Sequence, residues 1–251
     1  MVNAMLNRLS KVSWLGEVAL SVGCGAFVGR SGDNQPHRHW AHQVVIGLDR
    51  KIQVATKSGH FEAQGFWIPA GVRHQLMYAP VLSIYLDPAG HNWPCPSNPV
   101  CDSKQGVIPL DDSIRESYLE VFTGSGPLTE TLNQFRNRFM TSAECPKLKC
   151  VLKELHEGST LGLDVSRKTL ADLTKLSPSR FSHWFSEQTG LPLRSYKKWL
   201  KMLSALKFSQ EMPLTDAAVI AGFADKAHFC RAVQDAFGVT PATIANLLSE
   251  K

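Results

Sequence analysis

A degenerate repeat in the last third of the chain constrains its fold more than any other feature of the sequence. Each copy contains a small residue, a phenylalanine and a glycine: Ala171, Phe181 and Gly190 in the first copy, and Ala218, Phe229 and Gly238 in the second. The small residues are 47 positions apart (218 − 171), whereas the phenylalanines and the glycines are 48 apart (229 − 181 and 238 − 190). The second copy therefore has one additional residue in its turn.

The spacing within each copy is typical of a helix-turn-helix motif. A small residue lets two helices approach closely, and a short turn follows it, at 174–177 or 222–224. Ser177 is placed to cap the next helix and Pro178 to occupy its first turn. Gly190 supplies the left-handed residue that ends that helix. An ordinary helical bundle would show apolar stripes without this matched order of small residue, turn, phenylalanine and cap, so we predict two helix-turn-helix motifs.

Residues 166–248 resemble the AraC/XylS family of bacterial transcription regulators. The resemblance rests on Leu170-Ala171-Asp172-Leu173, Leu176 to Ser182, Thr189-Gly190, Gly222 to Ala232, and Phe237-Gly238-Val239-Thr240-Pro241. Three positions depart from the family pattern: Lys201 stands for the usual Arg, Ala217 for Ile and Val233 for Phe. The resemblance covers about a third of the chain, and its second helix-turn-helix motif, from Gly222 on, is highly diagnostic.

The resemblance implies a unit of seven helices, with a long helix at about 193–211 joining the two motifs. Two recognition helices would then enter successive major-groove faces about 34 Å apart. Arg180 and Arg231 are candidates for bidentate contacts with guanine. Two alternatives stay open: Arg231 can pair with Asp235 four residues on, and His228 can pack against the first helix of its motif. The candidate DNA-binding residues are Ser179, Arg180, Ser182, His183, Lys226, His228 and Arg231.

The first hundred residues have a β pattern. Glycines are frequent there, and short apolar or alternating runs lie between them, at 44–46, 51–56, 66–68 and 81–86. This pattern indicates a sandwich or a barrel. From residue 109 the apolar period becomes helical, and we expect helices at 111–122 and 129–140. These helices either connect two domains, with a dimer seam along them, or pack within one chain.

Three histidines in the β region are candidates for a metal site. His37 and His39 would point to the same face of a strand, and a neighbouring strand would bring His74 beside them. Three imidazoles suit a divalent transition metal. The spacing also resembles the two cupin motifs, in which a fourth ligand is usually Glu, whereas Gln43 stands at that position here. The candidate set of His37, His39, Gln43 and His74 therefore has a second interpretation, as buried hydrogen-bonded groups or as effector-binding groups.

Charge and cysteine content add two weaker constraints. The net charge of +5 divides into +1 for residues 1–140 (12 − 11) and +4 for residues 141–251 (15 − 11), which places the excess in the half with the repeat. The six cysteines form no C-x-x-C pair, and free thiols are expected, although the spacing of Cys95 and Cys101 would allow a bridge. No apolar run approaches the roughly 18 residues that a membrane helix needs, and no signal peptide is evident, so we expect a cytoplasmic protein.

We therefore predict an α+β protein with three parts: a cupin-like β-barrel sensor domain (1–100), a linker with connecting helices (101–145) and an AraC-type DNA-binding domain (146–251). The predicted function is sequence-specific regulation of transcription, in which the barrel senses a small molecule or a metal. The alternative is a cupin metal-dependent enzyme with a helical accessory domain, although we expect no catalytic residues. The expected partners are double-stranded promoter DNA and a small-molecule effector. A second copy of the chain and RNA polymerase are further candidate partners, and the only candidate cofactor is a divalent transition metal.

Overall fold

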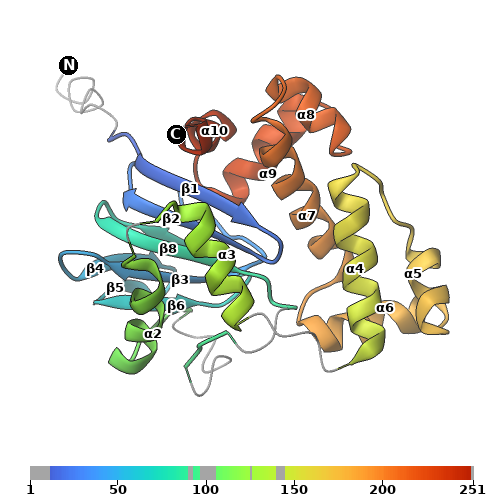
Figure 1. Ribbon diagram of the computed structural model, residues 1–251, viewed down its shortest axis with the longest axis horizontal. Coiled ribbons are helices and arrows are strands. Elements are labelled where there is room, and N and C mark those ends of the chain that lie inside the picture. The colour runs from blue at the N-terminus through green and yellow to red at the C-terminus, as the bar shows by residue number, and fades with distance from the viewer. Residues whose placement is uncertain (1–11, 90–92, 97–105, 125, 140–144, 250–251) are drawn as a thin grey trace.

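The computed structural model describes residues 12–89, 93–96, 106–124, 126–139 and 145–249. Strands occupy the amino-terminal part and helices the carboxyl-terminal part, as the α+β prediction requires (Figure 1). The five described cysteines, Cys95 among them, are free thiols, as expected, and Cys101 lies outside the described residues. Within the described part of the chain no helix is long and apolar enough to cross a membrane.

The strands form two antiparallel sheets rather than one closed barrel. The larger sheet has the order β1 (Leu15–Ser21), β2 (Cys24–Arg30), β8 (Pro80–Leu86), β3 (His42–Gly47), β6 (Gly65–Ile68) and β9 (Ile108–Pro109). The smaller sheet has the order β5 (Gly59–Ala63), β4 (Ile52–Thr56) and β7 (His74–Leu76). Each of the four predicted strand runs overlaps one of these strands. The barrel prediction was too specific, because hydrogen bonding stops at the sheet edges.

Side-chain alternation in β3 explains why its sequence is apolar without interruption. Val45 points into the core between the two sheets, whereas Val44 and Ile46 point to the opposite face. Two helices cover that face, α2 (Asp112–Phe122) and α3 (Leu128–Phe139) (Figure 1). A strand that is buried on both faces needs apolar residues at successive positions.

The helices α2 and α3 belong to the amino-terminal unit. The fully buried ring of Phe135 in α3 packs on Tyr118 of α2 and lies parallel to the indole of Trp93, at a centroid distance of 5.6 Å. Strand β9 also pairs with β6, so the segment 108–139 is attached to the sheets. Of the two alternatives left open for these helices, the structure shows packing within one chain.

The described residues from 145 to 249 form seven helices, the number that the resemblance implies. They are α4 (Pro146–Thr160), α5 (Arg167–Thr174), α6 (Pro178–Thr189), α7 (Leu193–Phe208), α8 (Leu214–Ile220), α9 (Lys226–Phe237) and α10 (Pro241–Ser249). The long helix α7 ends at Phe208, three residues before the predicted end. One apolar core runs through α4 to α10 and includes Ala41 and Ala89 of the sheet region, so the two parts of the chain share a packed interface.

Candidate functional site

The first helix-turn-helix motif consists of α5 and α6. Ser177 caps α6 by accepting a hydrogen bond from the Arg180 backbone N–H, and Gly190 ends the helix with φ of 70°. Phe181 and Phe185 are fully buried on the inner side of α6. Local sequence rules thus place this helix as predicted, with its other face turned to solvent.

Three of the four predicted DNA-binding residues on α6 are exposed: Ser179, Arg180 and His183. Ser182 is half-buried, and its hydroxyl donates to the backbone carbonyl of Pro178. A hydroxyl that is held by its own helix is less available for a base or phosphate. The geometry therefore favours the three exposed residues as contacts on this helix.

The second motif consists of α8 and α9. The carboxylate of Asp225 caps α9 by accepting from the His228 backbone N–H at 2.6 Å, a capping role that the sequence analysis did not assign. Lys226, His228 and Arg231 are all exposed. The His228 ring contacts the Phe223 ring edge to face at 5.3 Å, so it packs locally while part of it faces solvent. Among the described residues, Arg231 and Asp235 form no ion pair.

Position 201, where this chain has Lys in place of the family's usual Arg, has a structural partner. The ammonium of Lys201 lies 3.2 Å from the Asp164 carboxylate, which also pairs with Lys197. The hydrogen bond from Lys197 holds the pKa of Asp164 below its ordinary value. Lys197 and Lys201 thus fasten α7 to the segment before α5, which fixes the first motif on the long helix.

The carboxyl end of α9 is hydrogen-bonded to the amino-terminal unit. The Gln35 backbone N–H donates to the Gly238 carbonyl at 2.9 Å, and the Arg38 backbone N–H donates to the Asp235 carbonyl at 3.0 Å. A helix end leaves its last carbonyls without partners inside the helix, and here a loop of the sheet region supplies the donors. We call these contacts, together with the ring of Phe237, the α9 tether.

Phe237 extends the α9 tether into a group of aromatic rings. Its ring centroid lies 5.5 Å from that of Tyr85, 5.6 Å from that of Trp199 and 6.4 Å from that of His39. Tyr85 is a strand residue and Trp199 belongs to α7. The end of the second recognition helix therefore contacts both the sheet and the long helix.

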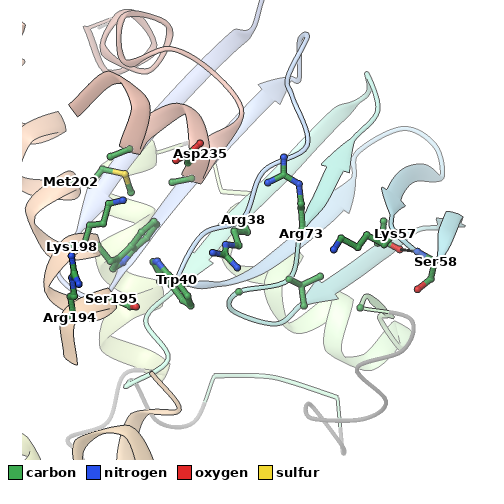
Figure 2. Close-up of a pocket in the computed structure, with 17 residues that line it drawn as sticks. Arg38, Trp40, Lys57, Ser58, Arg73, Arg194, Ser195, Lys198, Met202 and Asp235 are labelled. Atoms are coloured by element: carbon green, nitrogen blue, oxygen red, sulfur yellow. Dashed lines mark hydrogen bonds between the residues drawn. The ribbon is translucent and has the colours of Figure 1, made fainter. Parts of the chain in front are cut away.

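A cleft of about 780 Å³ opens beside the α9 tether, between the sheets and the helices (Figure 2). Its volume is within the range of small-molecule sites. Five cationic side chains and one carboxylate line it: Arg38, Lys57, Arg73, Arg194, Lys198 and Asp235. The indoles of Trp40 and Trp199 contribute apolar surface. None of these residues was predicted as a site from the sequence.

The histidine cluster is formed by two segments, 37–39 and 73–74, which also contribute residues to the cleft. His37, His39 and His74 are buried, and one potential ligand atom from each lies within 4.8 Å of the others. The intervening and adjacent residues Arg38 and Arg73 point into the cleft instead. The predicted grouping is confirmed, although the segment 37–39 is an irregular loop with one bridge, His37 to His74, and not a strand.

Backbone carbonyls orient all three imidazoles. Nδ1 of His37, His39 and His74 donates to the carbonyl of Gln35, Ala41 and Val72 respectively, at 2.7–3.0 Å. A carbonyl only accepts, so each Nδ1 carries the proton and each Nε2 keeps a lone pair. Histidines that ligate a metal through Nε2 commonly have this hydrogen bond from Nδ1 to a carbonyl.

Gln43 closes the histidine cluster. Its Oε1 lies 3.0 Å from Nε2 of His39 and 2.9 Å from Nε2 of His74, and its Nε2 donates to the Ser83 hydroxyl. The lone pairs of these three atoms converge, and a cation between them would satisfy all three. With the amide reversed, its NH₂ donates to both imidazoles and Ser83 donates to its oxygen. Gln43, His39 and His74 are thus satisfied in two arrangements, one with a cation and one without.

Burial keeps the cluster neutral. It lowers the pKa of His37 to about 3, with a further contribution from His39, and it lowers the pKa of His39 and of His74 below the ordinary value. Neutral imidazoles are the form that binds metals. A fourth histidine of this region, His42, lies in β3 outside the cluster, and its ring stacks on Trp67.

A second buried polar group joins the two parts of the chain. The hydroxyl of Tyr196 in α7 donates to the carboxylate of Asp87 at 2.6 Å, and His156 of α4 lies 3.0 Å from the same hydroxyl. Burial, followed by the charge of Asp87, raises the pKa of Tyr196 well above its ordinary value. We call Asp87, His156 and Tyr196 the α7 latch, because they connect the end of β8 to the helix between the two motifs.

Comparison with known proteins supports the helix-turn-helix assignment. A family model described as a helix-turn-helix domain matches residues 170–246. Similar solved structures include ToxT of Vibrio cholerae. An apo variant of ToxT has a TM-score of 0.56 at 11% identity, over 92% of this chain and 99% of that one.

Two further ToxT structures contain carboxylic acids. One is bound to (E)-4-(8-methylnaphthalen-1-yl)but-3-enoic acid, with a TM-score of 0.52 at 9% identity over 90% of this chain and 99% of that one. The other is bound to an unsaturated fatty acid, with a TM-score of 0.51 at 10% identity over 92% and 98%. At these identities the likeness shows a shared fold. The domain match and the two motifs described above show that the carboxyl-terminal part of the chain is an AraC-type helix-turn-helix domain, the kind of unit that binds DNA.

Proposed function

We propose that a small anionic effector binds in the cleft and thereby controls how the regulator engages DNA. The observation that carries this proposal is the position of the cleft: residues of the sheet unit line one side, and residues of α7 and α9 line the other. A ligand there contacts both parts of the molecule at once. ToxT, which shares the fold, is bound to carboxylic acids in two of its structures, and this supports an acidic effector here.

The α9 tether provides the route from the cleft to DNA. Arg38 places its side chain in the cleft while its backbone N–H donates to the Asp235 carbonyl at the end of α9. An effector that moves Arg38 therefore changes the support of the second recognition helix. Coupling of this kind requires that the effector bind the two arrangements with different affinity.

DNA recognition is assigned to the exposed residues of α6 and α9. Arg180 and Arg231 are the proposed base contacts, and His183, Ser179, Lys226 and His228 are proposed to contribute base or phosphate contacts. We propose further that the protein is not an enzyme. A second copy of the chain and RNA polymerase remain predicted partners.

The DNA-binding proposal is tested with duplexes selected from a random pool by the full-length protein. We expect one sequence motif to be enriched, with affinity at least about 10³-fold above that for unrelated DNA. The affinity should fall as salt concentration rises, because counterions are released from the phosphates. Equal affinity for selected and scrambled duplexes would contradict the proposal.

The effector proposal is tested by measuring DNA affinity in the presence of acids. Oleate and 1-naphthylbutyrate are suitable first probes, with the corresponding primary alcohols as uncharged controls. We expect at least one acid to raise the melting temperature and to change DNA affinity at least fivefold, while its alcohol does neither. If alcohols and acids act alike, the cationic lining does not select the effector.

A divalent transition metal in the histidine cluster is a second proposal, favoured by the three Nδ1–H donors that leave the Nε2 atoms facing inward. His37, His39 and His74 would hold the ion, with Gln43 as a neutral fourth ligand. Such an ion would fix the loop that carries the α9 tether. Four neutral ligands leave the charge of the ion uncompensated, so the affinity should be lower than in a site with a carboxylate.

Substitution of Gln43 tests the metal proposal. We expect Co²⁺ to bind the natural protein with the visible absorption of a histidine site, and Gln43→Glu to raise the affinity at least tenfold. The matched control is Gln64→Glu, at an exposed position between β5 and β6, which should leave Co²⁺ affinity unchanged. If the natural protein and Gln43→Glu both fail to bind Co²⁺ while remaining folded, the histidines serve only as a hydrogen-bonded core.

A further inference from the structure

The cations that line the cleft fall into groups from different parts of the chain. Lys57 and Arg73 come from the sheet unit, and Arg194 and Lys198 come from the first two turns of α7. Figure 2 shows these two groups on opposite sides of the view, with Arg38 and Trp40 between them. The cleft therefore presents a pair of cations on each side, with the fifth cation, Arg38, between the two pairs.

These cationic side chains have no ion-pair partner in the part of the chain that the structure describes. Among the described residues of the lining, Asp235 is the one acidic residue, so these residues carry a net charge of +4 (5 − 1). A monoanion at one end would leave the other group of cations without a counter-charge.

The space between the two groups suits an uncharged middle section. Arg38 lies over the ring of Trp40 at 5.4 Å, which keeps its guanidinium beside the indole, and Trp199 and Met202 add apolar surface near α7. A volume of about 780 Å³ is much larger than a single carboxylate requires.

We propose that the effector is a small dianion whose two acidic groups are separated, so that one binds Lys57 and Arg73 and the other binds Arg194 and Lys198. This inference rests on the proposed function and specifies the ligand class of the same cleft. Carboxylate and phosphate groups share the necessary chemistry, because both accept several charge-assisted hydrogen bonds from Arg and Lys. Such a ligand bridges the sheet unit and α7, and it draws together two surfaces that otherwise repel each other.

The test compares ligands that differ in one charged end. Isothermal titration at low salt is carried out with a series of straight-chain dicarboxylates of four to ten carbons, the monocarboxylates of equal length, and the matching terminal bisphosphates. We expect one length to bind best and at least tenfold more tightly than its monocarboxylate. The bisphosphate series then distinguishes a carboxylate from a phosphate ligand.

Variants at each end locate the two acidic groups. We expect Lys57→Met with Arg73→Met, and separately Arg194→Met with Lys198→Met, to reduce dicarboxylate affinity to that of the monocarboxylate. The matched control is Arg50→Met with Lys51→Met, two exposed cations outside the cleft, which should leave the affinity unchanged.

Three results would overturn the proposal. Equal affinity for mono- and dicarboxylates would show that one acidic group suffices, while a change in DNA affinity on binding would leave the proposed function intact. Loss of ligand-free DNA binding in both cleft variants, with ligand affinity unchanged, would assign the cations to the DNA backbone. If no anion binds or alters DNA affinity, the proposed function fails together with the dianion.

Discussion

The two helix-turn-helix motifs have the same local construction and different surroundings. Both recognition helices have a side-chain cap at the start and a glycine with φ of 70° at the end. Around Gly190 there is open space, whereas Gly238 adjoins Gln35 and His37 of the sheet unit. The first motif is fixed to α7, but the second is also attached directly to the part of the chain that carries the cleft and the histidines. We infer that effector control acts mainly through the second motif.

The largest expected effect is a loss of stability in acid, because the histidine cluster lies beside the second motif only. The folded protein keeps His37, His39 and His74 neutral with lowered pKa values, while the unfolded chain takes up protons on them below about pH 6.5. The free energy of unfolding should therefore fall as the pH drops from about 6.5 towards about 3, the pKa of His37. Each histidine contributes at most about 1.4 kcal/mol to this fall per pH unit, so the three together contribute at most about 4 kcal/mol per pH unit.

Urea unfolding with a chelator present measures this slope. Hydrogen exchange at pH 5.5 should show the end of α9 losing protection before the end of α6, because only α9 is attached to the histidine loop. A flat stability profile, or equal loss of protection in both helices, would contradict a link between the cluster and the second motif.

Alanine at the two capping glycines tests the difference directly. Both substitutions impose left-handed strain of about 1 kcal/mol on a residue with a Cβ. At position 238 the new Cβ would also lie 2.8 Å from Nδ1 of His37 and would press on the Gln35 backbone, whereas at position 190 it meets no atom within 4 Å. We expect Gly238→Ala to cost about 3 kcal/mol in urea unfolding and Gly190→Ala about 1 kcal/mol. Similar costs would mean that the α9 tether contributes little.

Local rules explain why the motifs could be predicted from the sequence. Ser177 caps the start of α6, and Gly190 and Gly238 cap the ends of α6 and α9. Each acts within one turn of its helix, so residue type and spacing suffice to predict the helix ends. The cupin-like spacing likewise predicted that His37, His39 and His74 lie together, although the first two are in a loop and the third is in a strand. Their grouping depends on two short segments that face each other.

No comparable sequence pattern predicts the contacts between the two parts of the chain. The Gln35–Gly238 hydrogen bond and the Asp87–Tyr196 hydrogen bond join residues about 200 and 109 positions apart, and no periodicity records such pairs. The cleft is hidden for the same reason, because its cations come from four separate segments. One clue was present: a strand at His37-Arg38-His39 would turn Arg38 away from the two histidines, and Arg38 does line the cleft, although the segment is a loop.

The α7 latch should show a smaller effect than the α9 tether. Tyr196→Phe removes the donor to Asp87 and leaves a buried carboxylate with fewer hydrogen bonds, at a cost of about 2 kcal/mol. Because α7 supports both motifs, Tyr196→Phe should weaken the DNA contacts of both motifs equally. Duplexes altered in one half-site or the other should then show the same loss of affinity. The control is Tyr78→Phe, on an exposed side chain, which should leave stability unchanged. An effect confined to one half-site would show that the latch serves a single motif.

Arg180 and Arg231 provide the most specific comparison of the two recognition helices. Each replacement by Ala should cost about 1–3 kcal/mol of DNA affinity if the side chain reads guanine, and should relax selectivity at the base pairs of its own half-site. Lys226→Ala should instead weaken binding to all duplexes alike and reduce the salt dependence by about one unit. If the α9 tether transmits the effector signal, an effector should still change the affinity of Arg231→Ala less than that of Arg180→Ala, because only Arg231 reads DNA from the attached helix. Fluorescence anisotropy with duplexes altered in one half-site, with and without effector, measures both the half-site selectivity and the effector response of each variant. An equal effector response in the two variants would place the control on the whole helical domain rather than on its second motif.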